Sequence, residues 1–319
     1  MPNIVTITFS PSIDKSTSVA ELISEKKLKC APPKLEAGGG GVNIARAIKK
    51  LGGVATAVFP SGGYTGKFFN YLLKKEEVPT VIIEVENETK ENFVVLEEFT
   101  SKQYRFGMPS NALSLEEVNQ ILYAVSNIKN PKFIIASGSL PPGVPVDIYA
   151  DLSKIAKKSG AKFIVDTSGE ALKHAFNEGA YLIKPNLLEL ATLAGLEKIE
   201  VKDVERVAKE LINKNTCEVI VVSLGADGAM LITKNEAHLV EAPKVEAKST
   251  VGAGDSMVAG MVYALSKGFS FEKVLQYGVA CGSAATMNRG TELCKKEDVE
   301  VLMSVIRGQV SHNLTPDSY

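Results

Sequence analysis

Two hydrophobic patterns, one typical of strands and one of helices, alternate along the middle of the chain. Short continuous apolar runs are typical of strands covered on both faces, and apolar residues three or four positions apart predict amphipathic helices. Helices are expected near 114–127, 145–159, 186–195 and 202–214, and strands near 133–136, 163–166, 181–184 and 219–223. This alternation predicts an α/β fold with a doubly wound, mostly parallel sheet.

The same patterns predict elements on both sides of this region. Residues 4–9 alternate apolar side chains with threonine and are expected to form a strand. Residues 42–51 form an amphipathic helix that ends at Gly52. Residues 229–233 and 238–240 are expected to form a hairpin, and residues 253–267 a helix that ends at Gly268.

A small second sheet is expected beside the main one. Residues 80–85, 92–99 and 103–106 have strand patterns, and the last two are joined closely enough for a hairpin. Residues 11–36 are too charged for a core. We therefore expect a β lid from 11–36 and 88–108, a main domain from 1–10, 37–87 and 109–309, and a flexible tail at 310–319.

Composition narrows the class of protein. With a net charge of −1 over 319 residues, the protein has no overall electrostatic attraction to nucleic acid or to an acidic membrane. Four cysteines and three histidines are scattered without metal-ligand or disulfide spacing. There is no signal-peptide pattern and no apolar run near the ~20 residues of a membrane span. We expect a reduced, cytoplasmic protein without nucleic-acid or membrane partners.

The segment from Ser249 to Ser256 carries the clearest chemistry. Gly252 and Gly254 let the backbone turn tightly and approach a ligand where a loop becomes a helix. Free N–H groups and the helix dipole meet there and suit a phosphate. Asp255 in the first helical turn can approach a substrate hydroxyl. The alternative is a glycine-rich turn followed by an ordinary helix-start acid.

Polar segments also follow several predicted strands. They are Ser137-Gly138-Ser139, Asp166 to Gly169, Lys184-Pro185-Asn186 and Ser223 to Gly228. Open α/β sheets bind ligands at the carboxyl ends of their strands. These segments therefore predict a site along one edge of the sheet.

Two stretches together resemble the ribokinase-like (PfkB) sugar kinases. They are Gly38 to Ala47, a glycine run that matches neither the dinucleotide fingerprint nor the P-loop, and Ser249 to Asp255. The resemblance spans about residues 3–305 and is greatest to the branch of minor bacterial 6-phosphofructokinases. Residues 12–14, 27–30, 137–143, 184–186 and 283–288 fit that branch.

The resemblance implies ATP-dependent phosphorylation of fructose 6-phosphate to fructose 1,6-bisphosphate. Relatives that act on fructose 1-phosphate or tagatose 6-phosphate usually carry lysine where this chain has Gly40. Those two activities remain alternatives, as does a catalytically silent sugar-phosphate sensor. Lys29 and Lys90 stand where arginines are expected, and lysine lacks the bidentate fork of arginine.

The resemblance also implies roles for single residues. Asp255 would be the base, and the N–H groups of Gly252, Ala253 and Gly254 would stabilise the transferred phosphoryl group. The sugar phosphate would contact Ser12, Asp14, Lys27, Lys29, Gly39, Asn43, Lys90 and Ser139. ATP would contact Lys184, Asn186, Ser223, Gly225, Gly228 and Ser283.

Two cations and one partner are implied as well. Glu189 would hold Mg²⁺ through water, and backbone oxygens near Ser249, Val251, Ala285, Asn288, Gly290 and Glu292 would hold K⁺. Asp166 is a further candidate for contact with a metal or the substrate. Plainer structural roles remain open: a helix cap for Asn43, a solvated side chain for Glu189 and a strand-end cap for Asp166. The apolar face of the lid predicts a homodimer. Excess ATP is expected to inhibit near Lys27.

Overall fold

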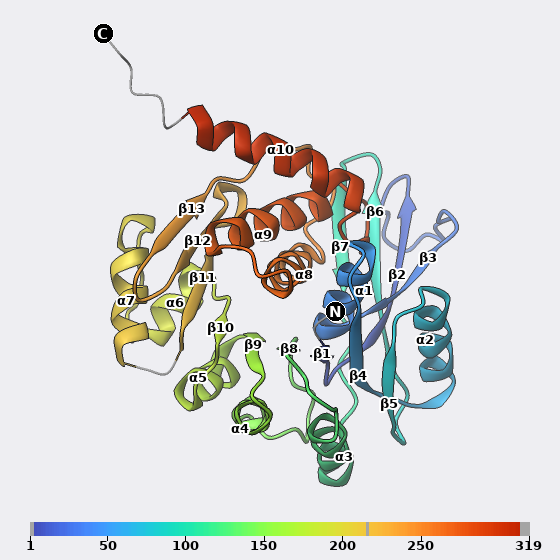
Figure 1. Ribbon diagram of the computed structural model, residues 1–319. Helices are drawn as coiled ribbons and strands as arrows, with labels where there is room; N and C mark the ends of the chain where they lie inside the picture. The colour runs from blue at the N-terminus through green and yellow to red at the C-terminus, as the bar shows by residue number, and fades with distance from the viewer. Residues whose placement is uncertain (1–2, 215–216, 313–319) are drawn as a thin grey trace.

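The computed structural model describes residues 3–214 and 217–312. Its main sheet has nine strands in the order β13-β12-β11-β10-β9-β8-β1-β4-β5 (Figure 1). Neighbours pair in parallel from β11 to β5, and β11, β12 and β13 pair antiparallel. The predicted α/β fold is confirmed. The strands are β1 (Ile4–Ile7), β4 (Ala55–Ser61), β5 (Thr80–Glu84), β8 (Phe133–Ser137), β9 (Lys162–Asp166), β10 (Leu182–Ile183), β11 (Val219–Ser223), β12 (Ala229–Ile232) and β13 (Ala237–Val240).

Helices cover both faces of this sheet, as Figure 1 shows. One apolar layer includes α1 (Gly40–Lys50), α2 (Gly63–Lys75), α8 (Ala253–Ser266), α9 (Phe271–Thr286) and α10 (Lys296–His312). The other includes α3 (Leu115–Ser126), α4 (Ile148–Ser159), α5 (Gly169–Glu178), α6 (Leu187–Leu193) and α7 (Val204–Lys214). In β8, Phe133 and Ile135 face the first layer while Ile134 and Ala136 face the second. This two-sided burial explains the continuous apolar runs.

Helices α8 and α9 pack closely, which fixes the helix that carries Asp255. A Cβ at Gly260 would lie 2.5 Å from the carbonyl oxygen of Tyr277. A Cβ at Gly278 would lie 2.7 Å from Cγ of Met261. Glycine at both positions therefore lets the two helices approach.

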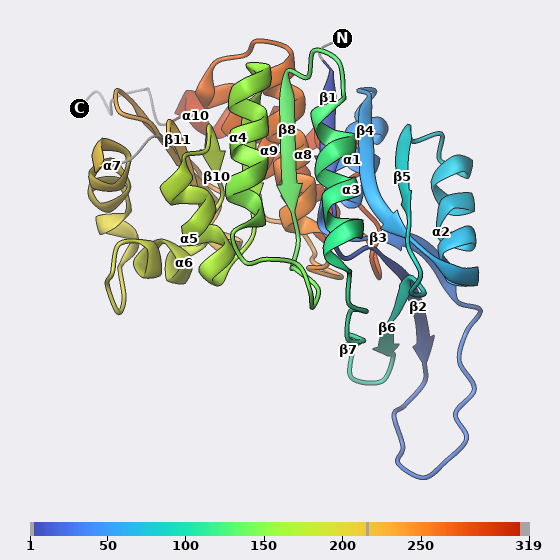
Figure 2. The ribbon, with the colours of Figure 1, turned by 90° about the horizontal axis from the view of Figure 1, so that it is seen from below.

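A second sheet of four strands has the order β3-β2-β6-β7, and Figure 2 shows it projecting from the body. Its strands are β2 (Ser12–Val19), β3 (Lys34–Gly38), β6 (Lys90–Glu97) and β7 (Lys102–Phe106). The expected hairpin is present, because β6 and β7 pair antiparallel. Strand β2 bridges the two segments by pairing with β3 on one side and β6 on the other. The small sheet is confirmed, and we call it the lid.

Several elements are absent from the sequence-based prediction. They are β4, α2, α5, α9 and α10. Helix α10 continues to His312, so it includes residues 310–312 of the expected tail. The rest of that tail, 313–319, lies outside the described residues. None of the described helices is long and apolar enough to cross a membrane.

Candidate active site

The candidate site begins where the loop before α8 enters the helix. Gly252 caps the helix with φ of 74°, a left-handed conformation that favours glycine. A Cβ there would also lie 2.8 Å from Cδ2 of Leu293. Ala253 and Gly254 follow as the first helical residues. The N–H of Ala253 donates to the carbonyl oxygen of Thr250 at 3.4 Å, and the N–H of Gly254 lies at the helix start, where N–H groups lack intrahelical partners. The glycine-rich turn that the sequence predicts at the start of the helix is therefore present, and its binding of an anion stays a prediction.

Asp255 lies in the first turn of α8 and meets Asn43 from α1. Nδ2 of Asn43 donates to Oδ2 of Asp255 at 2.9 Å. Burial raises the pKa of Asp255 to about 7, and the negative charge of Asp166 adds to this increase. The hydrogen bond from Asn43 and the charge of Lys184 oppose it. A carboxyl group with this pKa exchanges a proton near neutral pH.

Lys184 and Asp166 form an ion pair at the ends of β10 and β9. Nζ of Lys184 lies 3.1 Å from Oδ1 of Asp166, and both side chains are largely buried. Burial disfavours the lysine charge, but Asp166, Asp255 and Glu189 outweigh that effect and raise the pKa of Lys184. Lys184 is therefore a stable cation. A Cβ at Gly254 would lie 3.8 Å from its Nζ, so the lysine reaches the start of α8.

Asp14 occupies the lid side of the site, on β2. Its Oδ1 accepts from Oγ of Ser12 at 2.9 Å and from Nδ2 of Asn92 at 3.0 Å. Burial raises the pKa of Asp14 despite these bonds. Gly39 caps α1 with φ of 106°, and a Cβ there would lie 2.8 Å from Cγ2 of Thr8. The structure thus places Asp14, Gly39 and Asn43 on elements that meet at the first glycine run.

The lysines expected around the sugar phosphate do not all gather. Nζ of Lys90, at the start of β6, donates to Oγ of Ser110 at 3.0 Å. Burial lowers the pKa of Lys90, and Asp14 partly offsets that shift. Lys27 and Lys29 are exposed on the long loop between β2 and β3, which extends away from the body in Figure 2. Ser139 is exposed in the loop after β8.

A pocket of about 560 Å³ lies beside the start of α8. It is large enough for a nucleotide-sized ligand. Four expected nucleotide-binding residues line it, together with Lys184 and Gly254: Ser223, Gly225, Gly228 and Ser283 are all at its wall. Gly228 has φ of 106°, and a Cβ there would lie 2.0 Å from the carbonyl oxygen of Val240. That glycine is therefore required by the hairpin that borders the pocket.

Asn186 and Glu189 form a capping box at the start of α6. The Asn186 side chain accepts from the N–H of Glu189, and Oε2 of Glu189 accepts from the N–H of Asn186, both at 2.9 Å. The helix-cap role accounts for both residues without a metal. Within residues 3–214 and 217–312, no cluster of three His, Cys, Asp or Glu side chains is placed to hold a metal ion. Mg²⁺ bound mainly by waters and phosphate needs only one such carboxylate.

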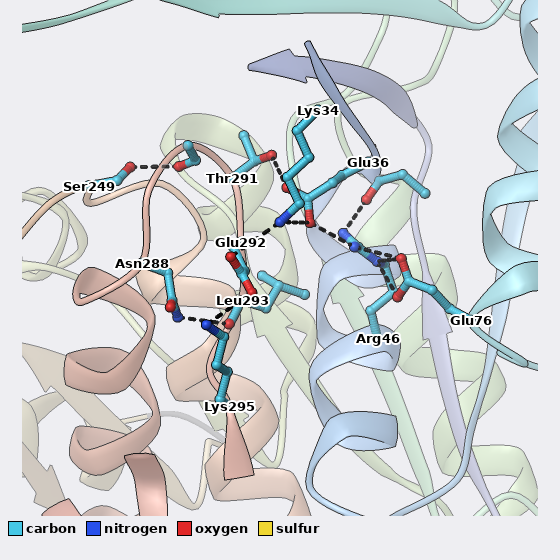
Figure 3. Close-up of polar contacts among 12 residues, drawn as sticks. Lys34, Glu36, Arg46, Glu76, Ser249, Asn288, Thr291, Glu292, Leu293 and Lys295 are labelled. Carbon is cyan, nitrogen blue, oxygen red and sulfur yellow. Dashed lines mark hydrogen bonds and ion pairs between the residues drawn. The ribbon is translucent and has the colours of Figure 1, made fainter. Parts of the chain in front are cut away.

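The two loops expected to hold a monovalent cation meet in the structure. Oγ of Ser249 donates to the carbonyl oxygen of Gly290 at 2.7 Å (Figure 3). The backbone N–H of Ser249 donates to the carbonyl oxygen of Thr286 at 3.2 Å. Hydroxyl and carbonyl oxygens are the ligands that hard cations take, so these residues fit K⁺. The carboxylate of Glu292 instead pairs with Lys34 at 3.2 Å. The other residues expected there, Val251, Ala285 and Asn288, lie on the same two segments, and the Ala285 oxygen accepts from the N–H of Asn288 at 3.2 Å.

Sequence reasoning missed three polar residues near the site. Asn92 and Ser110 hold Asp14 and Lys90. Arg105, on β7, reaches the loop before α8. Asn92 and Arg105 lie on strands that the sequence did predict, so strand alternation is the signal that could have found them. Ser110 lies in a loop without any such pattern.

Comparison with known proteins agrees with this geometry. The profile of the pfkB family carbohydrate kinases matches residues 8–298. The ATP-dependent 6-phosphofructokinase isozyme 2 of Escherichia coli is 42% identical over 96% of this chain and 99% of its own length. A crystal structure of phosphofructokinase-2 from Escherichia coli in complex with potassium superposes with a TM-score of 0.92, at 42% identity, over 96% of this chain and 100% of that chain.

A more distant relative, the 1-phosphofructokinase of Borreliella burgdorferi, is 30% identical over 95% of this chain and 97% of its own length. The family profile covers most of the chain, and both relatives align over nearly their whole length. The chain therefore belongs to the pfkB family of carbohydrate kinases.

Proposed function

We propose that the protein is an ATP-dependent 6-phosphofructokinase that transfers the γ-phosphoryl group of ATP to fructose 6-phosphate. The observation that carries this proposal is the position of Asp255. It lies in the turn between the 560 Å³ pocket and the lid side of the site, and it is hydrogen-bonded to Asn43. The identity to the 6-phosphofructokinase of Escherichia coli over nearly all of both chains supports the choice of sugar.

In this proposal Asp255 orients the attacking hydroxyl and takes its proton. Phosphoryl transfer depends mainly on positioning and charge stabilisation. The N–H groups of Gly252, Ala253 and Gly254 would stabilise the transferred group, and Lys184 would contribute a positive charge beside it. A base with a pKa of about 7 is matched to neutral pH.

The two substrates would occupy the two sides of Asp255. The ATP base and ribose fit the pocket lined by Ser223, Gly225, Gly228 and Ser283, with the phosphates directed to Lys184 and Asn186. The sugar hydroxyls fit Asp14, Gly39 and Asn43, and Ser12 positions Asp14. Lys90 and Ser139 would bind the 6-phosphate, together with Lys27 and Lys29 when the loop between β2 and β3 approaches a site.

Two cations complete the proposal. Glu189 would contact Mg²⁺ through water, and bound Mg²⁺ supplies charge neutralisation of the ATP phosphates. K⁺ would be held where the loop at Ser249 meets the loop at Gly290, next to the anion-binding turn. In this position the cation would stabilise the loop that leads into α8.

The lid favours a homodimer. Phe93, Tyr104 and Phe106 leave 38%, 38% and 47% of their surfaces exposed on one face of β6 and β7. Val94 follows Phe93 in β6, so its side chain points to the opposite face of the lid, and there it is buried. The exposed aromatic side chains therefore lie on one face of the lid. A second copy of the lid would cover that face, and it would bring the loop with Lys27 and Lys29 near a neighbouring site.

Gly40 is the residue that separates fructose 6-phosphate from the alternatives. A Cβ at Gly40 would lie 2.3 Å from Oγ of Ser137 and 2.7 Å from its carbonyl carbon. A lysine at position 40 would therefore force the loop after β8 to move. The site of this chain is shaped for glycine at position 40, whereas relatives that act on fructose 1-phosphate or tagatose 6-phosphate usually carry lysine at that position.

A coupled ADP-release assay over a panel of phosphorylated sugars tests the proposal. Fructose 6-phosphate is expected to give the highest kcat/KM, with tagatose 6-phosphate a slower substrate. Asp255→Ala serves as the inactive control. Preference for fructose 1-phosphate would contradict the argument from Gly40, and ADP release with none of the sugars would fit a sugar-phosphate sensor.

A further inference from the structure

Arg46 is a buried cation that the proposed mechanism does not use. It lies on α1 and is 2% exposed. Its guanidinium binds Glu76 in a fork, with Nε to Oε2 at 2.9 Å and Nη2 to Oε1 at 2.7 Å (Figure 3). Nη2 also donates to Oε1 of Glu36 at 3.2 Å, and Nη1 donates to the carbonyl oxygen of Ala37. These contacts hold the planar group in one orientation.

The same guanidinium approaches Asn43, one helical turn earlier on the same face of α1. Nη1 of Arg46 lies 3.5 Å from Oδ1 of Asn43. This distance is at the upper limit for a hydrogen bond, but the direction of the bond is unambiguous because arginine only donates. The oxygen of the Asn43 amide must face Arg46. Its NH₂ group then faces Asp255, where Nδ2 and Oδ2 are 2.9 Å apart.

The reversed amide would be unfavourable at both ends. Its NH₂ group would face the N–H groups of Arg46, and its oxygen would face the carboxylate of Asp255. Without Arg46, only an ionised Asp255 would hold the amide in this orientation, and a protonated Asp255 could donate to the Asn43 oxygen instead. The orientation of one side-chain amide therefore depends on a residue that does not touch the substrate.

We propose that Arg46 is a positioning residue, which keeps the Asn43 amide turned so that its NH₂ group donates to Asp255. The inference rests on the proposed function for its effect on turnover, but the hydrogen bond itself does not. Glu36 and Glu76 form ion pairs with Arg46 and so stabilise its buried positive charge. Glu36 in turn accepts a hydrogen bond from Oγ1 of Thr291 at 2.9 Å. The lid strand β3, helix α1 and the loop after α9 thus meet at the cluster that orients the base.

The consequence is a change in the ionisation of Asp255. The charged groups that face it are Asp166 from β9, Lys184 from the end of β10 and Asp14 from β2. Both aspartates raise its pKa, while Lys184 and the Asn43 hydrogen bond lower it. Loss of the correctly turned amide removes one of the two opposing effects. The pKa of Asp255 should then rise further.

The test uses Arg46→Lys and, as matched control, Glu76→Gln. Lysine keeps the buried charge but cannot hold Glu76, Glu36, Ala37 and Asn43 together. Glu76→Gln weakens the same cluster and leaves the contact of Arg46 with Asn43 in place. We expect the acidic limb of kcat/KM against pH to move up by at least half a pH unit in Arg46→Lys and not in Glu76→Gln. Equal profiles in both variants would overturn the proposal.

Two further measurements separate this inference from the proposed function. In an Asn43→Ala background, Arg46→Lys should cause no additional shift, because the effects of coupled residues are not additive. A ¹³C-carboxyl titration of aspartate-labelled protein, with Asp255 assigned from Asp255→Asn, should show its pKa raised in Arg46→Lys. The titration needs no turnover, so an unshifted signal overturns the inference even if the sugar substrate proves to be another.

A second variant covers the case in which Arg46→Lys fails to fold. The double variant Arg46→Met with Glu76→Gln removes the cation together with the charge of its main partner, so that Glu76 is not left as an unpaired carboxylate. Glu36, the more buried of the two glutamates, keeps Lys34 at 3.4 Å and the hydrogen bond from Thr291. It should show the same upward shift of the Asp255 titration. A wild-type titration in a folded double variant would overturn the proposal.

Discussion

Arg105 donates a hydrogen bond from Nη2 to Oγ1 of Thr250 at 2.8 Å, which joins lid strand β7 to the loop before α8. A second hydrogen bond joins the same two segments, because Oγ of Ser249 donates to Oε1 of Gln103 on β7 at 3.3 Å. The loop after α9 also approaches the lid: a Cβ at Gly290 would lie only 2.7 Å from Oγ of Ser16 on β2. The lid thus lies directly against the loop that leads into α8 and the loop after α9.

Arg105→Ala should uncouple the lid from that turn. We expect kcat/KM for fructose 6-phosphate to fall about tenfold, which corresponds to about 1.4 kcal/mol of transition-state stabilisation. Lys102→Ala is the matched control, because Lys102 is an exposed cation at the other end of the same strand, where its charge acts on Glu97. Steady-state kinetics of both variants check the prediction. Equal losses would assign the effect to lid charge and not to the contact with Thr250.

Asp255→Asn should lower kcat by roughly 10²–10⁴-fold, the range for a positioned acid–base group. It should also raise thermal stability. The pKa of Asp255 is about 7 in the folded protein and 3.8 in its ordinary state, so the wild type loses stability as pH rises between these values. The asparagine variant should therefore have the higher Tm at pH 8 and lose that advantage near pH 4. An unchanged kcat, or a lower Tm at pH 8, would contradict the prediction.

Lys90→Ala should raise the KM for fructose 6-phosphate by about tenfold and leave the KM for ATP within about twofold. The reason is that Lys90 is a partly buried cation beside Asp14 and Ser110, where the 6-phosphate is proposed to bind. Lys90→Arg should retain or improve the affinity because a guanidinium binds phosphate in two places. Lys67→Ala, on the exposed face of α2, is the control. A change confined to the KM for ATP would contradict the assignment of Lys90 to the proposed sugar-phosphate site.

Replacing Na⁺ by K⁺ at constant ionic strength should increase the rate in the presence of Mg²⁺. The expected cause is a cation between the loops of Ser249 and Gly290, which are already joined at 2.7 Å. Ser249→Ala removes that bond and should reduce the difference between the two salts. Equal rates of the wild type in both salts would remove the cation from the proposed mechanism.

Sedimentation at micromolar protein should give twice the mass of one chain if two lids cover each other. Phe93→Lys, with its side chain 38% exposed on the lid face, should shift the protein toward the monomer. Tyr123→Lys, which places the same charge on an exposed site of α3, should leave the mass unchanged. A fully active wild-type monomer would contradict the assembly through the lid.

The middle of the fold was predictable because β8, β9 and β11 are buried on both faces and alternate with amphipathic helices. Strand β4 was missed because it contains Pro60, yet Pro60 pairs beside Ile83 inside the sheet. Helix α9 contains Gly278 and Gly282, which weaken a helical pattern and serve its packing on α8. Such packing glycines have a meaning only when the neighbouring helix is known.

In the candidate site, too, features set by the local sequence could be predicted, and contacts between distant residues could not. The turn at Gly252 and the pocket-lining glycines are local features, so their backbone roles could be read from the sequence. The bond between Asn43 and Asp255 joins residues 212 positions apart, and no local pattern specifies it. The capping box of Asn186 and Glu189 has an ordinary sequence signature, so its structural role could be read locally, whereas no local pattern specifies a metal at Glu189.

The route of the chain through the lid also determines the order in which the protein can fold. Asp14 and Asn92 are hydrogen-bonded neighbours in the lid but lie 78 positions apart, and α1, β4, α2 and β5 separate their strands. Closing such a loop is entropically costly until the intervening elements have folded. We therefore expect the lid to form after the body and to open first in native-state hydrogen exchange. A chain with its body intact and its lid open would be a folded protein without the lid side of the proposed sugar site, so we expect activity to be lost before the body unfolds.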